Sequence, residues 1–450
     1  MRRTPTLQPM RPETHYARNG DAHIAYQVIG DGPLDVVFVS SFMSNIDLQW
    51  EHPAMSAFAK RISAFSRLIL FDRRGNGMSD GAPGVTTLDD QVDDVRAVIE
   101  AADADRPAVL AINEGASLAL LFAAAHPDCV RALVLAAPVP CMIRQEGYEW
   151  AQTVEEREDY IRLLVANWGR DTAENPWIGM GGDDPECHAA MARFQRLAGG
   201  PGDALAALRQ TMDTDVRGVM GSIQCPTLVL HRSHDEFVDP RHSRYVAEHV
   251  PGAEYVELDG AGTVWAGDPE EPVREIEAFL TGAQPPVPSE RVLATVMFTD
   301  IVGSTGLAEQ LGDARWRELL HRHDALVQAE VANHRGRVVK WLGDGALATF
   351  DGPSRAIACA LAVRDGVREL GLATRAGLHT GECELLADDD IGGIAVHIAA
   401  RIAALAGSEE ILASSTVRDL AIGSPYVLAD RGEQELKGVE RAWQVFAVAA

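Results

Sequence analysis

The 450-residue sequence predicts two domains of different fold class, an α/β domain followed by an α+β domain. A chain of this length exceeds one ordinary hydrophobic core. Up to residue 282, short apolar runs alternate with helical patterns. A proline-rich stretch at 283–290 then interrupts them, and because it can sustain neither a helix nor a central strand, we interpret it as a linker.

The α/β pattern covers residues 19–282, after an N-terminal tail at 1–18. Continuous apolar strands separated by helices indicate a mostly parallel sheet that is covered on both faces. Residues 141–220 are polar and helix-prone with scattered Trp and Met, which predicts an inserted cap over the C-terminal edge of the sheet. The expected strands are 36–40, 68–71, 108–112, 132–136, 227–231 and 254–258, and the expected helices include 87–102 and 117–125.

Residues 291–450 follow a different order, which is typical of an α+β sheet backed by helices. We expect a strand at 291–300, one or two helices at 304–333, a hairpin at 337–350 broken near Asp344, a helix at 354–370, a strand at 372–384 and a helix at 394–406.

The composition narrows the function. A formal net charge of −26 argues against a general binder of nucleic acids or anionic membranes, because such partners require clustered Lys and Arg. The six cysteines form no C-x-x-C pair, and neither a disulfide framework nor a zinc site is indicated. No apolar stretch reaches the roughly 18 residues of a membrane span. We therefore expect a soluble, cytoplasmic protein.

Two aspartates, Asp300 and Asp344, each end an apolar β-like run where the chain turns. Paired carboxylates beside a phosphate-sized loop are how proteins hold Mg²⁺ or Mn²⁺ on a nucleotide, because hard cations take oxygen ligands and share them with phosphates. Taken alone, such a pair of aspartates more often only caps turns. Further motifs in the C-terminal third favour the metal site.

Residues 291–450 resemble a class III nucleotidyl cyclase catalytic domain over essentially their whole length. The matching motifs are FTDIVGST at 298–305, LGDG at 342–345, RAGLHTGE at 375–382, VHIAAR at 396–401 and ELKG at 435–438. The resemblance implies a ferredoxin-like core and conversion of ATP or GTP to the 3′,5′-cyclic nucleotide and pyrophosphate.

The resemblance also implies roles for individual residues. Asp300 and Asp344 hold two Mg²⁺ or Mn²⁺ ions, with the Ile301 carbonyl as an extra ligand. Arg401 stabilises charge that develops on the α-phosphate, and Lys437 binds the terminal phosphates. The backbone amides of residues 302–305 face the phosphates, which makes Gly303, Ser304 and Thr305 substrate-binding residues.

Base choice rests on Lys340 and Asp390, which match the residues that adenylyl cyclases of this family direct at adenine. A lysine donates to adenine N1 and a carboxylate accepts from the N6 amino group, whereas guanine presents the opposite pattern. ATP is therefore favoured, with a cyclase that also uses GTP as the alternative. The other interpretation of Asp390 is that it only keeps the acidic loop 388–390 solvated.

His397 departs from the pattern, because the family commonly has an asparagine there that touches the ribose. It precedes Arg401 by one helical turn and shares its face. Either the imidazole replaces the amide's hydrogen bond or it points away, and we favour the second because the two groups place their donors differently. Since the family builds each site from two such domains, the resemblance implies a homodimer.

Residues 19–282 resemble an α/β-hydrolase. The matching segments are DRRGNGMS at 72–79, LAINEGA at 110–116, CPTLVLH at 225–231 leading to Asp235, and GAGT at 260–263. A hydrolase of this type needs a serine nucleophile in G-x-S-x-G, a later acid and a late histidine. Here these positions hold Asn113, Asp235 and Thr263, so only the acid is kept.

We therefore predict no ester hydrolysis, because the members of a triad act as a unit. Ser117 lies one helical turn past the elbow and does not replace the nucleophile. Two uses remain open for this domain: a pocket for a small apolar or amphipathic ligand, or a dimerisation platform. The whole chain resembles hydrolase–cyclase fusion proteins of mycobacteria and related actinobacteria. The rival functions are an esterase or lipase regulated by a cyclase-like module, and a non-catalytic nucleotide-binding scaffold.

Overall fold

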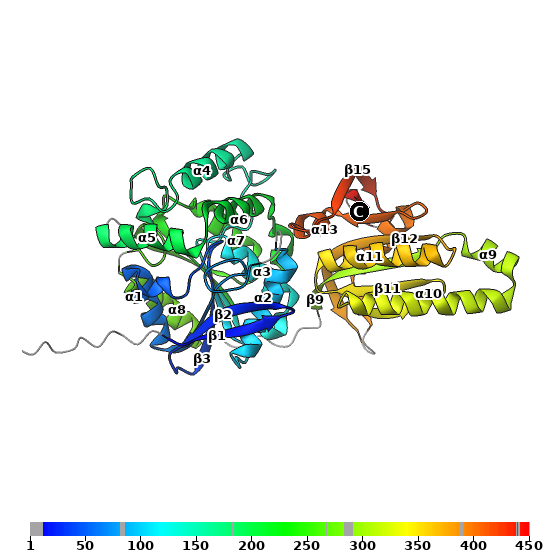
Figure 1. Ribbon diagram of the computed structural model, residues 1–450, viewed down its shortest axis with the longest axis horizontal. Helices are drawn as coiled ribbons and strands as arrows, with labels where there is room; N and C mark the ends of the chain where they lie inside the picture. Colours follow the sequence, from blue (N-terminus) through cyan, green and yellow to red (C-terminus); the bar gives the residue numbers. More distant parts are fainter. Residues whose placement is uncertain are drawn as a thin grey trace, which may run out of the picture. The chain divides into compact units, whose positions relative to one another are not determined.

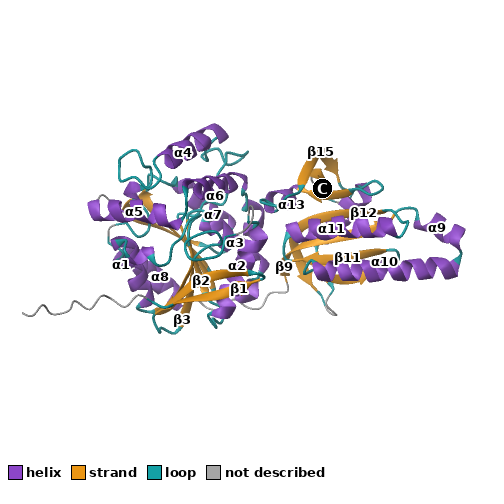
Figure 2. Cartoon of the chain, viewed as in Figure 1, coloured by secondary structure: helices purple, strands orange, loops and turns teal. Residues whose placement is uncertain are grey.

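The computed structural model contains two compact units, one formed mainly by residues up to Gly282 and the other mainly by residues from Arg291 onward. Each unit has its own sheet with packed helices (Figures 1 and 2). The proline-rich stretch at 283–290 lies outside the described residues. The structure describes residues 12–81, 86–181, 184–266, 268–282, 291–386, 390–437, 439 and 442–449.

The first sheet has the order β1-β2-β4-β3-β5-β6-β7-β8. The pairs from β4 to β8 are parallel, whereas β1 pairs with β2, and β2 with β4, in antiparallel fashion. The mostly parallel sheet predicted from the apolar runs is thus confirmed. Its strands are β1 (Thr14–Asn19), β2 (Ala22–Ile29), β3 (Leu34–Val39), β4 (Ser66–Phe71), β5 (Ala108–Ile112), β6 (Ala132–Ala136), β7 (Thr227–His234) and β8 (Glu254–Ala261).

The predicted boundary between a tail at 1–18 and a domain starting at residue 19 is wrong, because β1 (Thr14–Asn19) already pairs with β2 along its whole length. The sequence pattern gave no sign of this strand. As an edge strand it buries only Ala17, so no run of alternating apolar residues marks it.

Helices cover both faces of the first sheet (Figure 2). Apolar residues of α1 and α8 pack with Leu68, Leu110 and Leu228 in one core cluster. The sheet helices are α1 (Pro53–Ser63), α2 (Leu88–Ala101), α3 (Gly115–Ala125), α7 (Pro240–His249) and α8 (Glu270–Gly282). Between β6 and β7 the chain forms α4 (Val154–Ala166), the short helix η3 (Ile178–Gly181), α5 (Pro185–Ala198) and α6 (Pro201–Asp213), which share a separate cluster of buried apolar side chains.

The second sheet has the order β10-β11-β9-β12-β14-β16-β15, with β13 paired to β12. All neighbours are antiparallel except β12 and β14. The strands are β9 (Arg291–Ile301), β10 (Arg337–Trp341), β11 (Gly345–Phe350), β12 (Thr374–Leu385), β13 (Ile391–Gly392), β14 (Ile411–Ser414), β15 (Val427–Glu435) and β16 (Ala442–Ala449). The helices are α9 (Ser304–Leu311), α10 (Asp313–Asn333), α11 (Pro353–Glu369), α12 (Ile394–Leu405) and α13 (Ser415–Leu420).

The two faces of the second sheet are covered by different helices. On one face, Met297 and Ala348 share a core cluster with residues of α10 and α11, including Val327 and Ile357. On the other face, Val296 and Leu347 pack with Ala395 and Ala399 of α12. Because side chains alternate along a strand, these contacts assign every residue of β9 to one face or the other.

Candidate functional site

Asp300 lies on the sheet face that α12 covers. It follows Val296 and Phe298 at every second position of β9, and both pack in the cluster that includes α12 residues. Gly345 of β11 is its register partner on one side and Arg375 of β12 its partner on the other. Asp344 immediately precedes Gly345, so the hairpin brings the second predicted aspartate next to the end of β9.

Asp300 is engaged by a cation in this structure. Nη2 and Nε of Arg375 donate to its Oδ2 atom at 2.6 and 3.0 Å, and both side chains are 35% exposed. The sequence motif contained Arg375, but we assigned it no role, because the ion pair depends on the register between β9 and β12. A metal ion at Asp300 would have to share this carboxylate with Arg375 or displace it.

The two predicted aspartates supply only some of the oxygen ligands that a hard cation needs. Asp300 and Asp344 supply carboxylate oxygens, which Mg²⁺ and Mn²⁺ prefer. Within the described ranges, no group of three or more His, Cys, Asp or Glu side chains could hold a metal ion. A metal here would therefore need oxygens from elsewhere, such as the Ile301 carbonyl, water or a phosphate of the substrate.

Lys340 and Asp390 form an ion pair although 50 positions separate them in the sequence. The Nζ atom of Lys340 lies 2.8 and 2.7 Å from the two carboxylate oxygens of Asp390. This hydrogen bond, together with one from the Ile391 N–H, lowers the pKa of Asp390. Lys340 is the register partner of Leu347, which places it on the same sheet face as Asp300.

The ion pair is exposed, with 43% of the Lys340 side chain and 34% of the Asp390 side chain accessible. Pairs of this kind contribute little to stability, because solvent screens them and side-chain entropy is lost in holding them. Both groups are therefore available to a ligand. Residues 388 and 389 of the acidic loop lie outside the described residues.

α12 presents His397 and Arg401 on its exposed side, one turn apart as expected. The Nε atom of Arg401 donates to the backbone carbonyl of Lys437 at 3.2 Å, so the structure brings together the two residues that we assigned to the phosphates. Lys437 is exposed as well. His397 makes no side-chain hydrogen bond to any described residue, which agrees with an imidazole that serves no structural purpose.

The loop at 302–305, whose backbone amides we expected to face the phosphates, differs from that expectation at one residue. The Val302 N–H donates to the carbonyl of Ala373 at 2.8 Å, so this amide belongs to the sheet and is unavailable to a phosphate. Gly303 has a φ of 72°, which favours glycine, and α9 begins directly after it at Ser304. The first N–H groups of a helix have no partner within it, so the backbone at Gly303, Ser304 and Thr305 remains the anion-facing part.

In the first unit, the three triad positions lie after the carboxyl ends of parallel strands, where ligands of α/β sheets bind. Asn113 follows β5 and has a φ of 45° in the turn to α3. Asp235 follows β7, and its Oδ1 atom accepts from the N–H groups of Phe237 and Val238 at 2.8 and 3.2 Å. Thr263 follows β8, and its hydroxyl donates to the Met180 carbonyl at 2.9 Å.

The turn at Asn113 keeps the shape of a nucleophile elbow without its chemistry. A Cβ atom on Gly115 would lie 2.3 Å from the Ser40 carbonyl, so glycine is required where α3 passes the loop after β3. The left-handed conformation of Asn113 is one that asparagine tolerates better than most residues. An amide cannot attack an ester, and the Thr263 hydroxyl is already used within the protein.

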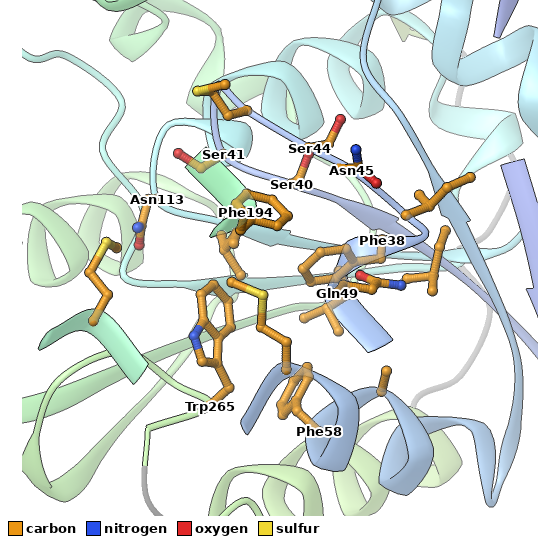
Figure 3. Close-up of a pocket in the computed structure, with 18 of the residues that line it drawn as sticks. Phe38, Ser40, Ser41, Ser44, Asn45, Gln49, Phe58, Asn113, Phe194 and Trp265 are labelled. Atoms are coloured by element: carbon orange, nitrogen blue, oxygen red, sulfur yellow. The ribbon is translucent and has the colours of Figure 1, made fainter. Parts of the chain in front are cut away.

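Asn113 borders an apolar cavity of about 80 Å³ (Figure 3). The rings of Phe38, Phe58, Phe194 and Trp265 lie around it. A second cavity of about 160 Å³, also lined by Asn113, is more polar and includes Glu114 and Arg157. We assigned neither residue a role from the sequence, since Arg157 belongs to the polar segment 141–220 and only the fold places it near the elbow.

Two protein-family models match the chain, one in each unit. Residues 56–261 match the family model "Serine aminopeptidase, S33", and residues 288–449 match the model "Adenylate and Guanylate cyclase catalytic domain". An esterase from Exiguobacterium antarcticum superimposes with a TM-score of 0.52 at 18% identity over 59% of this chain and 99% of its own, which shows the fold alone.

Curated relatives match parts of the chain. An uncharacterized protein of Mycobacterium tuberculosis is 29% identical over 247 residues, which cover 54% of this chain and 61% of the relative. A Rhizobium meliloti protein named "Putative adenylate cyclase 3" is 31% identical over 160 residues, which cover 34% of this chain and 27% of that protein. The chain thus spans less than two thirds of the length of either relative. Among the described residues, no helix is long and apolar enough to cross a membrane.

Proposed function

Because the chain joins an α/β-hydrolase domain to a class III adenylate/guanylate cyclase catalytic domain, we propose that it converts ATP to 3′,5′-cyclic AMP and pyrophosphate. The observation that carries this proposal is the ion pair between Lys340 and Asp390, which joins a donor and an acceptor for adenine. The hydrolase-like domain then serves as a ligand-binding or regulatory half.

The reaction needs charge neutralisation at both ends of an in-line displacement, because the ribose 3′-oxygen attacks the α-phosphorus while pyrophosphate leaves. Two Mg²⁺ or Mn²⁺ ions bound by Asp300 and Asp344 would supply Lewis acidity at the attacking oxygen and the phosphates. Arg401 donates to the α-phosphate oxygens and Lys437 to the terminal phosphates, so each offsets charge that grows in the transition state.

Adenine recognition follows from the chemistry of the ion pair. The ammonium group of Lys340 donates to N1 and the carboxylate of Asp390 accepts from the N6 amino group. Guanine offers a protonated N1 and a carbonyl at O6, so both contacts would oppose it. Purified protein should therefore form cyclic AMP from ATP faster than cyclic GMP from GTP with either metal. Equal rates would favour the alternative of a cyclase that uses both nucleotides.

We also propose that the active unit is a homodimer formed through the cyclase domain. Six large hydrophobic side chains are exposed on this unit near the candidate site, at the β10–β11 turn, after β12 and on α12. They are Trp341, Leu342, Leu385, Leu386, Ile394 and Leu405. A second copy of the domain would cover such a surface and add the other half of each site.

Mixing two inactive variants tests the shared site. If the metals bind to one chain and Arg401 acts from the other, Asp300→Ala and Arg401→Ala proteins should each be inactive yet recover activity together. Random exchange puts about half of the chains in mixed dimers with one intact site, so recovery should approach about a quarter of wild-type activity for independent sites. If one site works at a time, recovery should approach about half. No recovery after confirmed exchange would place the whole site within one chain.

For the first domain we propose a non-hydrolytic role, with residues 141–220 as its cap and 283–290 as the linker to the cyclase domain. Support comes from Asn113 and Thr263, which can act neither as nucleophile nor as general base. The rival is an esterase or lipase that the second domain regulates. Cleavage of a chromogenic ester by purified protein would favour that rival, and cyclic-nucleotide production would exclude a purely scaffolding protein.

A further inference from the structure

An apolar cavity and a more polar cavity are both lined by Asn113. The first is lined by buried apolar side chains of the sheet, α1 and α5, among them Leu110, Phe58 and Met191. Its volume of about 80 Å³ would hold roughly five to eight groups the size of a water molecule, given about 10–15 Å³ for each. Asn113, Trp177 and Met180 line both cavities, so the two cavities adjoin at the elbow.

The polar cavity contains hydrogen-bonding groups that the protein itself does not use. Arg157 is 4% exposed, and its Nε atom has no hydrogen-bond partner among the described residues. The indole N–H of Trp150 makes no hydrogen bond of good geometry, although the Tyr148 hydroxyl lies near it, and Oε1 of Gln152 has no donor among the described residues. All three residues line this cavity. Buried polar atoms are rarely left without a partner, so the N–H donors of Arg157 and Trp150 indicate a missing acceptor, whereas the Gln152 oxygen lacks a donor.

The charges around this cavity leave room for an anion. Glu114 lies 3.7 Å from Nη2 of Arg157, beyond hydrogen-bond distance, and it accepts from the Ser41 hydroxyl at 2.5 Å. It is also attracted to the buried Arg73. The other acidic residue lining the cavity, Asp239, is bonded to Arg241.

The basic residues that line this cavity are Arg157 and His242. Burial lowers the pKa of His242 to about 4, so this lining residue is neutral at pH 7. Burial likewise lowers the pKa of Arg157, and attraction to Glu114 opposes this shift. A carboxylate beside its Nε edge would supply the missing acceptor.

We propose that the two cavities form one binding site for an amphipathic carboxylate of medium chain length, with its apolar chain in the cavity at Phe58 and its carboxylate bound by Arg157 and Trp150. This rests on the proposed non-hydrolytic role of the first domain. The site binds a carboxyl group next to Asn113 without breaking any bond, because neither a nucleophile nor a general base is present at the elbow.

Octanoate is a suitable probe, because the seven carbons beyond its carboxylate fall within the roughly five to eight water-sized groups that the apolar cavity would hold. Titration of the full-length protein with sodium octanoate, followed by tryptophan fluorescence or calorimetry, should give saturable binding of one molecule per chain. Methyl octanoate keeps the chain but loses the charge, and acetate keeps the charge but loses the chain. Both should bind at least tenfold more weakly. Absence of saturable octanoate binding, or equal binding of the methyl ester, would overturn the proposal.

Three variants locate the site. Ala59→Leu fills the apolar cavity from α1, and Arg157→Lys keeps the charge but removes Nε; each should weaken octanoate binding at least tenfold. Trp150→Phe keeps an aromatic ring and removes one N–H, so octanoate binding should weaken three- to tenfold. The matched control is Trp316→Phe in the second unit, which should bind octanoate like the wild type. Unchanged binding in both Ala59→Leu and Trp150→Phe would place the ligand elsewhere.

Arg157→Lys leaves Glu114 with an altered partner, so thermal unfolding of each unliganded variant checks that it folds. If that variant fails to fold, the other two still decide the question. Cyclic AMP formation by the same preparations separates the two proposals. Octanoate binding without cyclase activity would refute only the cyclase function, whereas cyclase activity without octanoate binding would refute only the ligand site.

Discussion

In the cyclase unit, the polar side chains at the candidate site are exposed or half-buried and several are bonded to one another, whereas in the hydrolase-like unit the side chains at the triad positions are buried. Lys340 bonds to Asp390 at the surface, and both can exchange that partner for a nucleotide. Asp235 and Thr263 are instead committed to backbone groups of their own domain. The turns after the strands of the first sheet thus keep their backbone geometry although Asn113 and Thr263 cannot perform the chemistry of a hydrolase. The reason is that the fold depends on these turns and does not depend on reactive side chains at them.

The strongest test of this comparison removes the carboxylates of the cyclase unit. Asp300→Ala and Asp344→Ala should each abolish cyclic AMP formation, because each removes a metal ligand for which no carboxylate cluster among the described residues substitutes. Activity above about a tenth of wild type in either variant would contradict the metal assignment. The control is Asp313→Ala at the start of α10, an equal loss of charge that should leave activity within about twofold.

Arg401→Ala should lower turnover by about 10²-fold, which corresponds to about 3 kcal/mol of transition-state stabilisation. The reason is that the guanidinium offsets charge on the α-phosphate that grows only during reaction. Steady-state kinetics should show this loss in kcat more than in KM. Arg368→Ala on α11, whose side chain pairs with Glu409 at the surface, removes the same group away from the site and should have little effect.

His397→Asn and His397→Ala should change turnover by less than roughly tenfold, because the imidazole makes no hydrogen bond to a described residue. Kinetics with ATP and GTP would measure both rate and base preference. Complete loss of activity in His397→Ala would show that the imidazole replaces the ribose contact of the family's asparagine.

Asp235→Asn tests the hydrolase-like side of the comparison through stability. Burial raises the pKa of Asp235 to about 6 in the folded protein. The folded state therefore holds a proton that the unfolded state has lost between about pH 4 and pH 6, and stability falls as the pH rises through this window. Asparagine keeps an oxygen for the Phe237 and Val238 amides and does not ionise.

At pH 7 the free energy of unfolding of Asp235→Asn should therefore exceed that of the wild type by roughly 1–3 kcal/mol. The difference should vanish near pH 4. Unfolding of the full chain across that range measures it. A variant that is less stable at pH 7 would show that the ionised carboxylate is needed at this turn.

Most strands were predictable from the sequence because their local patterns suffice. The runs at 108–112 and 132–136 are buried on both faces, so every residue is apolar and the strands β5 and β6 have those bounds. The strands that were not expected are β1, β2, β13, β14, β15 and β16. Of these, β1 and β15 were missed for the opposite reason. Both lie at sheet edges, where most side chains face solvent and leave no apolar pattern.

The sequence by itself determined which chemistry is possible, because reactivity belongs to the residue: Asn113 cannot be a nucleophile and Thr263 cannot be a general base in any fold. It also supplied the motifs that carry Asp300 and Asp344. Only the tertiary structure decided which residues these side chains and backbone groups contact. The pairing of Asp300 with Arg375, the bond from Val302 to Ala373 and the cavity at Arg157 all depend on strand registers and loop packing between distant segments. No local pattern encodes such contacts, since they exist only once the sheets have formed.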